Sequence, residues 1–154
     1  MSDRSTTHAT FTVERTYDAT PARVFAAWAD QQAKAQWFGP GDGHTLDFRE
    51  GGREHLTVRA GDGSVYTVES RYHDIVPNER IVHSYEMHRD ADRISVSVAT
   101  VELRPDGERT QLRMTEQGVF LDGHDDPQAR ERGTREFLEA LGRALAAGAP
   151  DEAR

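Results

Sequence analysis

The chain has 154 residues, enough for one domain around one core, and 36% of them are hydrophobic. Its 19 Lys and Arg against 27 Asp and Glu give a net charge of −8, which disfavours binding to nucleic-acid phosphates. No apolar run reaches the ~18 residues of a membrane-spanning helix. The sequence has no cysteine for a disulfide, a thiolate nucleophile or a zinc site. We therefore expect one domain that binds neither nucleic acid nor membrane.

The two ends of the chain are predicted to lie outside this domain. Residues 1–9 are polar and lack both the apolar core and the cleavage pattern of a secretion signal. We expect a disordered leader at 1–9, a folded domain at 10–148 and a tail at 149–154. The absence of cysteine fits a cytoplasmic protein.

The first regular segments are a strand and a helix pair. In "TFTVERTYDA", residues 10–19, apolar and polar side chains alternate with the period of a strand that buries one face. Thr20 and Pro21 suit the N-cap and first position of an amphipathic helix. A second helical segment continues to Trp37 and Phe38, and the "GPG" that follows must end it, because proline lacks the amide that continues a helix.

Most of the remaining chain alternates with a period of two. From about residue 45 to 118 it reads "LDFRE", "REHLTVR", "SVYTVESRYHDIV", "ERIVHSYEMH", "RISVSVATVELR" and "TQLRMTEQG", separated by short turn-forming segments. Strands joined in this way pair as an antiparallel meander. Residues 126–148, "DPQARERGTREFLEALGRALAAG", instead carry a helical apolar stripe. The order predicts an α+β protein whose last helix lies across the sheet.

An ordered set of motifs resembles one known family. They are "YDATPARVFAAW" at 17–28, "WFGP" at 37–40, "FREGGR" at 48–53, "VPNERIV" at 76–82, "VELRPDGERTQLRMTEQG" at 101–118 and "RGTREFLEALG" at 132–142. In this order the chain resembles the START-like proteins of the SRPBCC (Bet v 1-like) superfamily, and within them the relatives of the activator of the Hsp90 ATPase. The motifs span nearly the whole chain, and "WFGP" is the most characteristic of them.

The resemblance implies a helix-grip fold. In it a curved antiparallel sheet of about six to seven strands wraps round the C-terminal helix, and two short helices follow the first strand. It also implies a cavity between sheet and helix that often holds a small hydrophobic molecule. Glu54, His83 and Thr134 stand where this family has apolar or aromatic side chains. One fold hosts many functions, so the chemistry must come from the residues themselves.

Tight turns at 60–64, 77–78 and 105–109 predict the register of three hairpins, and residues opposite each other share a face. The predicted inner face carries the pairs Tyr72–His83, Ser70–Tyr85, Val68–Met87, Val58–Tyr66, Leu56–Val68, Glu54–Ser70, Leu103–Leu112 and Val101–Met114, with Glu116 near Ala99. Two polar rows should therefore cross this face, one around Glu54 and Tyr85 and the other around His83 and Glu116.

Buried carboxylates need partners, so the surroundings of Glu54 and Glu116 are informative. One interpretation places both in water at the sheet margin, with His83 hydrogen-bonded to Tyr72 as a core histidine. Another makes His83 and Glu116 an acid–base pair, in which the carboxylate orients the ring and raises its pKa. We favour the first, because no serine lies on the strand-to-helix elbow that exposes a catalytic nucleophile.

Metal binding and cofactors are not expected. None of the seven histidines shows the spacing that places two on one helical face. The segments "GDGH" at 41–44 and "LDGHDD" at 121–126 lack the carboxylate count and closing glutamate of a calcium loop. We interpret both segments as turns.

The first hypothesis is a binding protein rather than an enzyme, which holds a small hydrophobic or aromatic molecule between the sheet and the last helix. Its predicted binding residues are Phe25, Trp28, Trp37, Phe38, Glu54, Leu56, Val58, Ser70, Tyr72, His83, Tyr85, Met87, Val101, Met114, Glu116, Phe137 and Leu141. Trp37 and Phe38 would either plug the core or gate the cavity, and we favour the plug.

Two alternatives stay open. A cyclase-like or hydrolase-like enzyme would use His83 and Glu116 as acid and base. A partner-binding module would assist an Hsp90-type chaperone ATPase, as the resemblance implies. Exposed edge strands could also support a homodimer.

Overall fold

The computed structural model describes residues 3–39 and 43–148. Its elements are β1 (Thr6–Tyr17), α1 (Pro21–Ala29), α2 (Gln31–Ala35), β2 (Gly43–Leu46), β3 (Arg53–Arg59), β4 (Val65–Val76), β5 (Arg80–Arg89), β6 (Asp92–Asp106), β7 (Arg109–Leu121) and α3 (Pro127–Ala147). This is the predicted order of strand, helix pair, strands and long helix. Within the described ranges, every helix is too short or too polar to cross a membrane.

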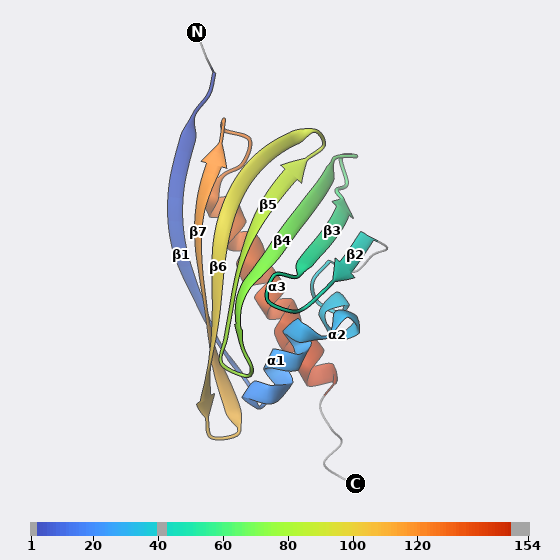
Figure 1. Ribbon diagram of the computed structural model, residues 1–154, viewed down its shortest axis with the longest axis vertical. Helices are drawn as coiled ribbons and strands as arrows, with labels where there is room; N and C mark the ends of the chain where they lie inside the picture. Colours follow the sequence, from blue (N-terminus) through green and yellow to red (C-terminus); the bar gives the residue numbers. More distant parts are fainter. Residues whose placement is uncertain (1–2, 40–42, 149–154) are drawn as a thin grey trace.

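Seven strands form one antiparallel sheet in the order β1-β7-β6-β5-β4-β3-β2. Consecutive strands from β2 to β7 pair with one another, and β1 pairs with β7. The sheet is curved, and α3 lies across one of its faces, with α1 and α2 near the C-terminal end of α3 (Figure 1). The predicted α+β helix-grip fold is therefore confirmed.

The predicted hairpin registers are also confirmed. Glu54 of β3 lies opposite Ser70 of β4, and Tyr72 of β4 lies opposite His83 of β5. The other predicted pairs are present on the same face. At the β4–β5 turn Asn78 has φ of 66°, a left-handed conformation that asparagine tolerates better than most residues. Turn chemistry and alternation thus decide which side chains face α3.

Local sequence sets the ends of the helices. The Thr20 side chain accepts a hydrogen bond from the Arg23 amide at 3.3 Å, and Pro21 occupies the first turn of α1. Asp126 caps α3 in the same way, and α3 ends at Gly148. These caps satisfy amides that would otherwise have no partner within the helix.

Buried hydrogen bonds join the elements around the core. The Tyr17 hydroxyl of β1 donates to the Leu138 carbonyl of α3 at 2.7 Å, and Arg23 of α1 donates to the Leu145 carbonyl at 2.8 Å. The core beneath them includes Val13, Val24, Trp28, Trp37, Ile81, Val101, Leu112, Leu138 and Leu141. This packing holds the second half of α3 tightly against the sheet.

Two predicted boundaries are wrong. The disordered leader at 1–9 overlaps β1, because β7 continues to Leu121 and pairs with Thr6. Within "LDFRE" only Leu46 belongs to a strand, and Phe48 instead packs its ring 5.0 Å from that of Tyr72. The predicted tail at 149–154 lies outside the described residues.

Candidate functional site

A cavity of about 530 Å³ lies between the inner face of the sheet and the first half of α3. Whereas Leu138, Leu141 and Leu145 of α3 enter the core, Ala129 and Gly133 border the cavity. Its mostly apolar lining consists of Trp28, Lys34, Phe38, Gly39, Leu56, Val58, Tyr66, Val68, Ser70, His83, Tyr85, Met87, Met114, Glu116, Asp125, Ala129, Arg130, Gly133, Thr134, Glu136 and Phe137. Small-molecule sites commonly have this size and character.

Most of the predicted binding residues border this cavity. Those that do are Trp28, Phe38, Leu56, Val58, Ser70, His83, Tyr85, Met87, Met114, Glu116 and Phe137. Those that do not are Phe25, Trp37, Glu54, Tyr72, Val101 and Leu141. Strand alternation gives the face on which a side chain lies, but not its depth, so it could not separate the cavity wall from the core behind it.

Four polar residues form a buried network that we call the lysine cluster: Lys34, His44, Glu54 and Tyr72. Lys34 Nζ donates to Glu54 Oε1 at 2.7 Å, and the Tyr72 hydroxyl donates to the same oxygen at 2.6 Å. His44 Nε2 lies 2.7 Å from Glu54 Oε2. Glu54 is only 2% exposed, so its predicted place in water at the sheet margin is wrong.

The surroundings of Glu54 favour its ionised form, whereas burial lowers the pKa of Lys34 and the charge of Glu54 offsets this only in part. Lys34 Nζ lies 4.5 Å from the ring centre of Phe38 and 5.3 Å from that of Trp28, within cation–π range. Burial by itself would raise the pKa of Glu54, but the Lys34 ammonium and the hydrogen bonds to the carboxylate outweigh it and lower that pKa to about 2. Glu54 is therefore ionised at neutral pH.

A second network, the arginine cluster, joins α3 to the sheet through Tyr85, Ser95, Glu116, Asp125, Arg130 and Thr134. Arg130 donates to Asp125 at 2.7 Å, to Ser95 at 2.8 Å and to the Tyr85 hydroxyl at 3.0 Å. Glu116 accepts hydrogen bonds from the hydroxyls of Tyr85 and, at 3.3 Å, Thr134. It is 2% exposed, so Glu116 does not lie at the sheet margin either.

Glu116 has a weaker cationic partner than Glu54. Arg130 divides its donors among several acceptors, and its nearest nitrogen lies 3.8 Å from the Glu116 carboxylate. Burial raises the pKa of Glu116, and the hydrogen bond from Tyr85 and the charge of Arg130 offset this only in part. Unlike Glu54, Glu116 borders the cavity.

His83 lies near the centre of the inner face, between Tyr72 of β4 and Ala99 of β6. Its ring centre is 5.5 Å from that of Tyr72 and 6.2 Å from that of Tyr85. Among the described residues, none is hydrogen-bonded to its buried Nδ1. Burial lowers the pKa of His83 to about 4, and the Lys34 ammonium adds to this effect. The ring is therefore neutral at pH 7.

Both predicted roles of His83 need correction. The Tyr72 hydroxyl donates to Glu54 rather than to His83, so the predicted hydrogen bond is wrong. The acid–base pair with Glu116 is also wrong, because the two residues stand on either side of Ala99 in the sheet. The pKa of His83 is lowered rather than raised, since burial disfavours the protonated ring and the Lys34 ammonium repels it.

Several functional residues were missed, although the sequence contained a signal for them. Lys34 precedes Trp37 and Phe38 by three and four residues, the spacing that places side chains on one helical face. Arg130 begins the buried α3 stripe that continues through Thr134 and Leu138. Single charged side chains are rarely buried, but here each has a partner.

The "WFGP" segment combines a plug and a cavity wall. Trp37 is 3% exposed, packs 4.7 Å from the Trp28 ring and donates from Nε1 to the Ala27 carbonyl, so it plugs the core. Phe38 borders the cavity instead. Gly39 has φ of +62°, and a Cβ there would lie 2.7 Å from Leu56 Cδ2. The left-handed φ favours glycine at this position, whereas Pro40 and Gly41 lie outside the described residues.

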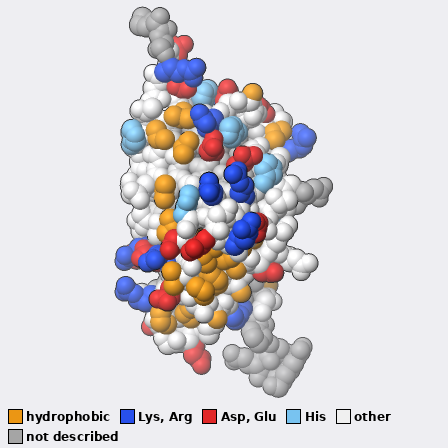
Figure 2. Space-filling model, in the orientation of Figure 1, with side chains coloured by type: hydrophobic (Ala, Val, Ile, Leu, Met, Phe, Trp, Pro, Cys, Tyr) orange, Lys and Arg blue, Asp and Glu red, His pale blue; other side chains and the backbone are white. Residues whose placement is uncertain are grey.

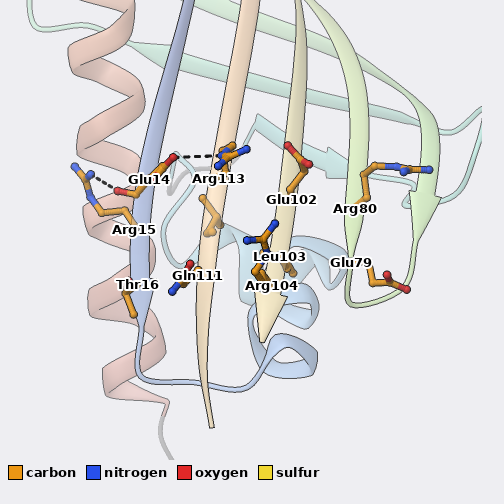
Figure 3. A pocket seen from close by; sticks show the side chains of 11 residues that line it. Glu14, Arg15, Thr16, Glu79, Arg80, Glu102, Leu103, Arg104, Gln111 and Arg113 are labelled. Atoms are coloured by element: carbon orange, nitrogen blue, oxygen red, sulfur yellow. Dashed lines mark hydrogen bonds and ion pairs between the residues drawn. The ribbon is translucent and has the colours of Figure 1, made fainter. Parts of the chain in front are cut away.

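The outer face of the sheet carries charges of both signs among scattered apolar side chains (Figure 2). Figure 3 shows a hollow on this face across β1, β7, β6 and β5. Glu14, Arg113, Glu102 and Arg80 lie side by side on these strands, so that opposite charges alternate. Exposed ion pairs of this kind contribute little to the stability of a protein and are screened by salt. We therefore place the candidate site in the inner cavity.

The two segments considered for cation binding have other roles. His44 of "GDGH" lies in β2 and contacts Glu54. In "LDGHDD" Asp122 turns the chain with φ of 57°, Asp125 pairs with Arg130 and Asp126 caps α3. Over the parts of the chain that are described, no group of three or more His, Asp or Glu side chains could hold a metal ion.

Comparison with known proteins gives relatives over the whole domain. A protein from Rhizobium leguminosarum of solved structure is 42% identical, with a TM-score of 0.90 over 94% of this chain and 98% of its own. Mll3558 from Rhizobium loti is 45% identical, with a TM-score of 0.86 over 92% and 99% of the two chains. CV1439 from Chromobacterium violaceum is 27% identical, with a TM-score of 0.73 over 92% and 98%.

The solved relatives carry no stated function. No functionally curated protein matches the chain. The model of the family described as activator of Hsp90 ATPase homolog 1-like protein matches residues 18–146, which hold every residue of both clusters. The chain belongs to the activator of Hsp90 ATPase homolog 1-like family.

Proposed function

We propose that this protein binds a small, partly apolar molecule in the cavity between the sheet and α3. The observation that carries this proposal is a mostly apolar space of about 530 Å³ into which a few polar groups converge, among them Ser70, His83 and Tyr85. Burial of the apolar surface of a ligand would supply most of the affinity, and the polar groups would orient it.

Packing supports the same proposal. Protein interiors are filled to the density of organic crystals and contain few voids larger than a water molecule. Here the core around Trp28 and Leu141 is closely filled, whereas the space beside Met87 and Met114 is left open. Methionine side chains adapt their shape to irregular partners. A bound molecule would complete this packing.

Gly133 offers a way to block the cavity without disturbing the core. It lies on α3 beside the cavity, and a Cβ added there meets no atom within 4 Å. Gly133→Trp should therefore direct a large side chain into open space. Gly133→Ala is the matched control, because it also replaces the helical glycine, with a gain of about 1 kcal/mol in helix propensity, but does not fill the cavity.

Native mass spectrometry of gently purified protein tests the proposal. We expect an added mass on the native protein and on Gly133→Ala, released on activation as one identifiable small molecule, and none on Gly133→Trp. An added mass that stays on Gly133→Trp would place the ligand elsewhere. A bare mass for all three proteins, after exposure to a cell extract, would contradict the proposal.

The family description favours a second proposal, in which the protein binds an Hsp90-type chaperone. A surface, rather than the cavity, would then carry the function, so Gly133→Trp should bind the chaperone as the native protein does. Stimulation of the ATPase activity of a purified Hsp90 by both proteins would support this proposal. Absence of binding and of stimulation would count against it.

A further inference from the structure

Two residues of the cavity wall, Trp28 and His83, carry a buried nitrogen that has no hydrogen bond among the described residues. His83 is 7% exposed, and the flanking rings of Tyr72 and Tyr85 limit the rotation of its imidazole. Buried polar groups are otherwise paired, so a histidine without a partner at the wall of an open space is a marker of a ligand contact.

The charged groups around the cavity are already neutralised or are acidic. Lys34 is paired with Glu54 at 2.7 Å, and Arg130 is paired with Asp125 at the same distance. The remaining charged lining residues are Glu116 and Glu136. Among the described lining residues, no cation is left to receive an anionic ligand. A carboxylate or phosphate placed here would meet acidic side chains and lose its hydration.

The walls favour a flat ligand. Aromatic rings border the cavity from three directions, with Trp28 and Phe38 beside the short helices, Tyr66 on β4 and Phe137 on α3. Aromatic pairs prefer edge-to-face or offset contacts that an aliphatic chain cannot make. An aromatic ligand should therefore bind to this lining more tightly than an aliphatic ligand of equal volume.

We propose that the ligand is an uncharged aromatic molecule with one hydroxyl or carbonyl group, which forms a hydrogen bond with the imidazole of His83. The inference rests on the proposed function and names the ligand class. A neutral imidazole has one donor and one acceptor nitrogen, so the choice of tautomer lets the ring pair with either group. The apolar part of the molecule would lie against Met87, Met114 and the aromatic walls.

Three probes with the same ring system separate the ligand classes: the isosteric pair 2-naphthol and 2-methylnaphthalene, and the anion 2-naphthoate. Equilibrium dialysis at pH 7.5 would measure the affinity of each for the native protein. We expect 2-naphthol to bind about 2- to 10-fold more tightly than 2-methylnaphthalene, the gain of one net hydrogen bond. The anionic 2-naphthoate should bind most weakly. Equal affinity for the first two probes, or tightest binding of the third, would overturn the inference.

Variants assign the preference to His83. In His83→Phe the preference for 2-naphthol should disappear while 2-methylnaphthalene still binds, and His83→Leu serves if the first variant does not fold. His73→Phe is the matched control, since His73 lies one residue from Tyr72 on the exposed face of β4. A preference that survives in a folded His83 variant would overturn the inference. Failure of all three probes to bind the native protein would count against the proposed cavity function itself.

Discussion

The lysine cluster and the arginine cluster contain the same components, yet they behave differently. Each joins a buried carboxylate to a cation and a tyrosine hydroxyl. In the lysine cluster the cation contacts the carboxylate at 2.7 Å, and the pKa of Glu54 falls to about 2. In the arginine cluster the cation lies 3.8 Å away, and burial raises the pKa of Glu116.

The difference follows from how each cation is shared. Lys34 is a point charge with one carboxylate within reach, whereas Arg130 spreads its donors over Asp125, Ser95 and Tyr85. A dedicated partner fixes the charge state of a buried acid, and a shared one does not. The lysine cluster closes one end of the cavity with a fixed ion pair. The arginine cluster leaves a carboxylate at the wall that can accept a proton.

Removal of the dedicated cation should have the largest effect. Lys34→Met leaves Glu54 buried without its charge partner, which should lower the free energy of unfolding by about 3–5 kcal/mol. Urea denaturation measures the loss. Arg130→Met should cost less, about 1–3 kcal/mol, because Glu116 can take up a proton and borders the cavity. Equal losses for the two variants would remove the distinction between the clusters.

The two carboxylates should give stability profiles of opposite slope. The pKa of Glu54 is lowered from 4.5 to about 2, so its contribution, about 3 kcal/mol, is present above pH 4.5 and is lost as the pH falls towards 2. The pKa of Glu116 is raised, so its ionisation lowers stability as the pH rises above 4.5.

Glutamine substitutions separate these contributions. Glu54→Gln should flatten the acid limb of the unfolding free energy below pH 4.5, whereas Glu116→Gln should remove a loss that grows above that pH. Urea denaturation between pH 2 and 8 provides both profiles. For each variant, the difference in the free energy of unfolding from the native protein is followed against pH. Slopes of the same sign for the two variants would contradict the assigned pKa shifts.

Loss of the Tyr72 hydroxyl tests how much its hydrogen bonds stabilise the lysine cluster. Tyr72→Phe removes the hydrogen bond of 2.6 Å to the ionised Glu54 and the one of 3.2 Å from Lys34, and it leaves the ring contacts with Phe48 and His83 in place. We expect a loss of about 1.5–3 kcal/mol in the free energy of unfolding, the range for hydrogen bonds to charged groups. Thermal and urea denaturation would measure it. A loss below about 0.5 kcal/mol, the lower end for one hydrogen bond, would mean that water replaces the hydroxyl.

The smallest effect is expected at Thr134. Its hydroxyl donates to Glu116 at 3.3 Å, longer than the Tyr72 bond, and the acceptor has other partners. Thr134→Val keeps the shape of the side chain and should lower the free energy of unfolding by about 0.5–1.5 kcal/mol. Thr134→Ser, which retains the hydroxyl, is the control. A loss as large as that of Tyr72→Phe would show that Glu116 depends on its hydrogen bonds as strongly as Glu54 does.

The fold was predictable because its signals are local and repeated. Alternation over β3 to β7 and the residues of the β4–β5 turn decide both pairing and face, as the Tyr72–His83 pair demonstrates. The apolar stripe over residues 126–148 predicted α3 and its buried side. The start of β1 was not predictable, because Thr6 is ordered by pairing with Leu121, a contact between distant parts of the chain.

The candidate site was predictable in position but not in chemistry. The register placed Glu54, His83 and Glu116 on the inner face, where the structure has them. Their partners come from helices, through Lys34 of α2 and Arg130 of α3. How a helix side chain meets a strand depends on tertiary packing, which strand alternation does not encode.

A crystal structure of the gently purified protein tests the central claim most directly, since it shows the cavity and both clusters together. The account predicts electron density for a flat molecule among Met87, Met114 and Phe137, with a polar atom within hydrogen-bond distance of the His83 imidazole. A cavity closed by the movement of α3 onto the sheet, with His83 hydrogen-bonded to the protein itself, would contradict it.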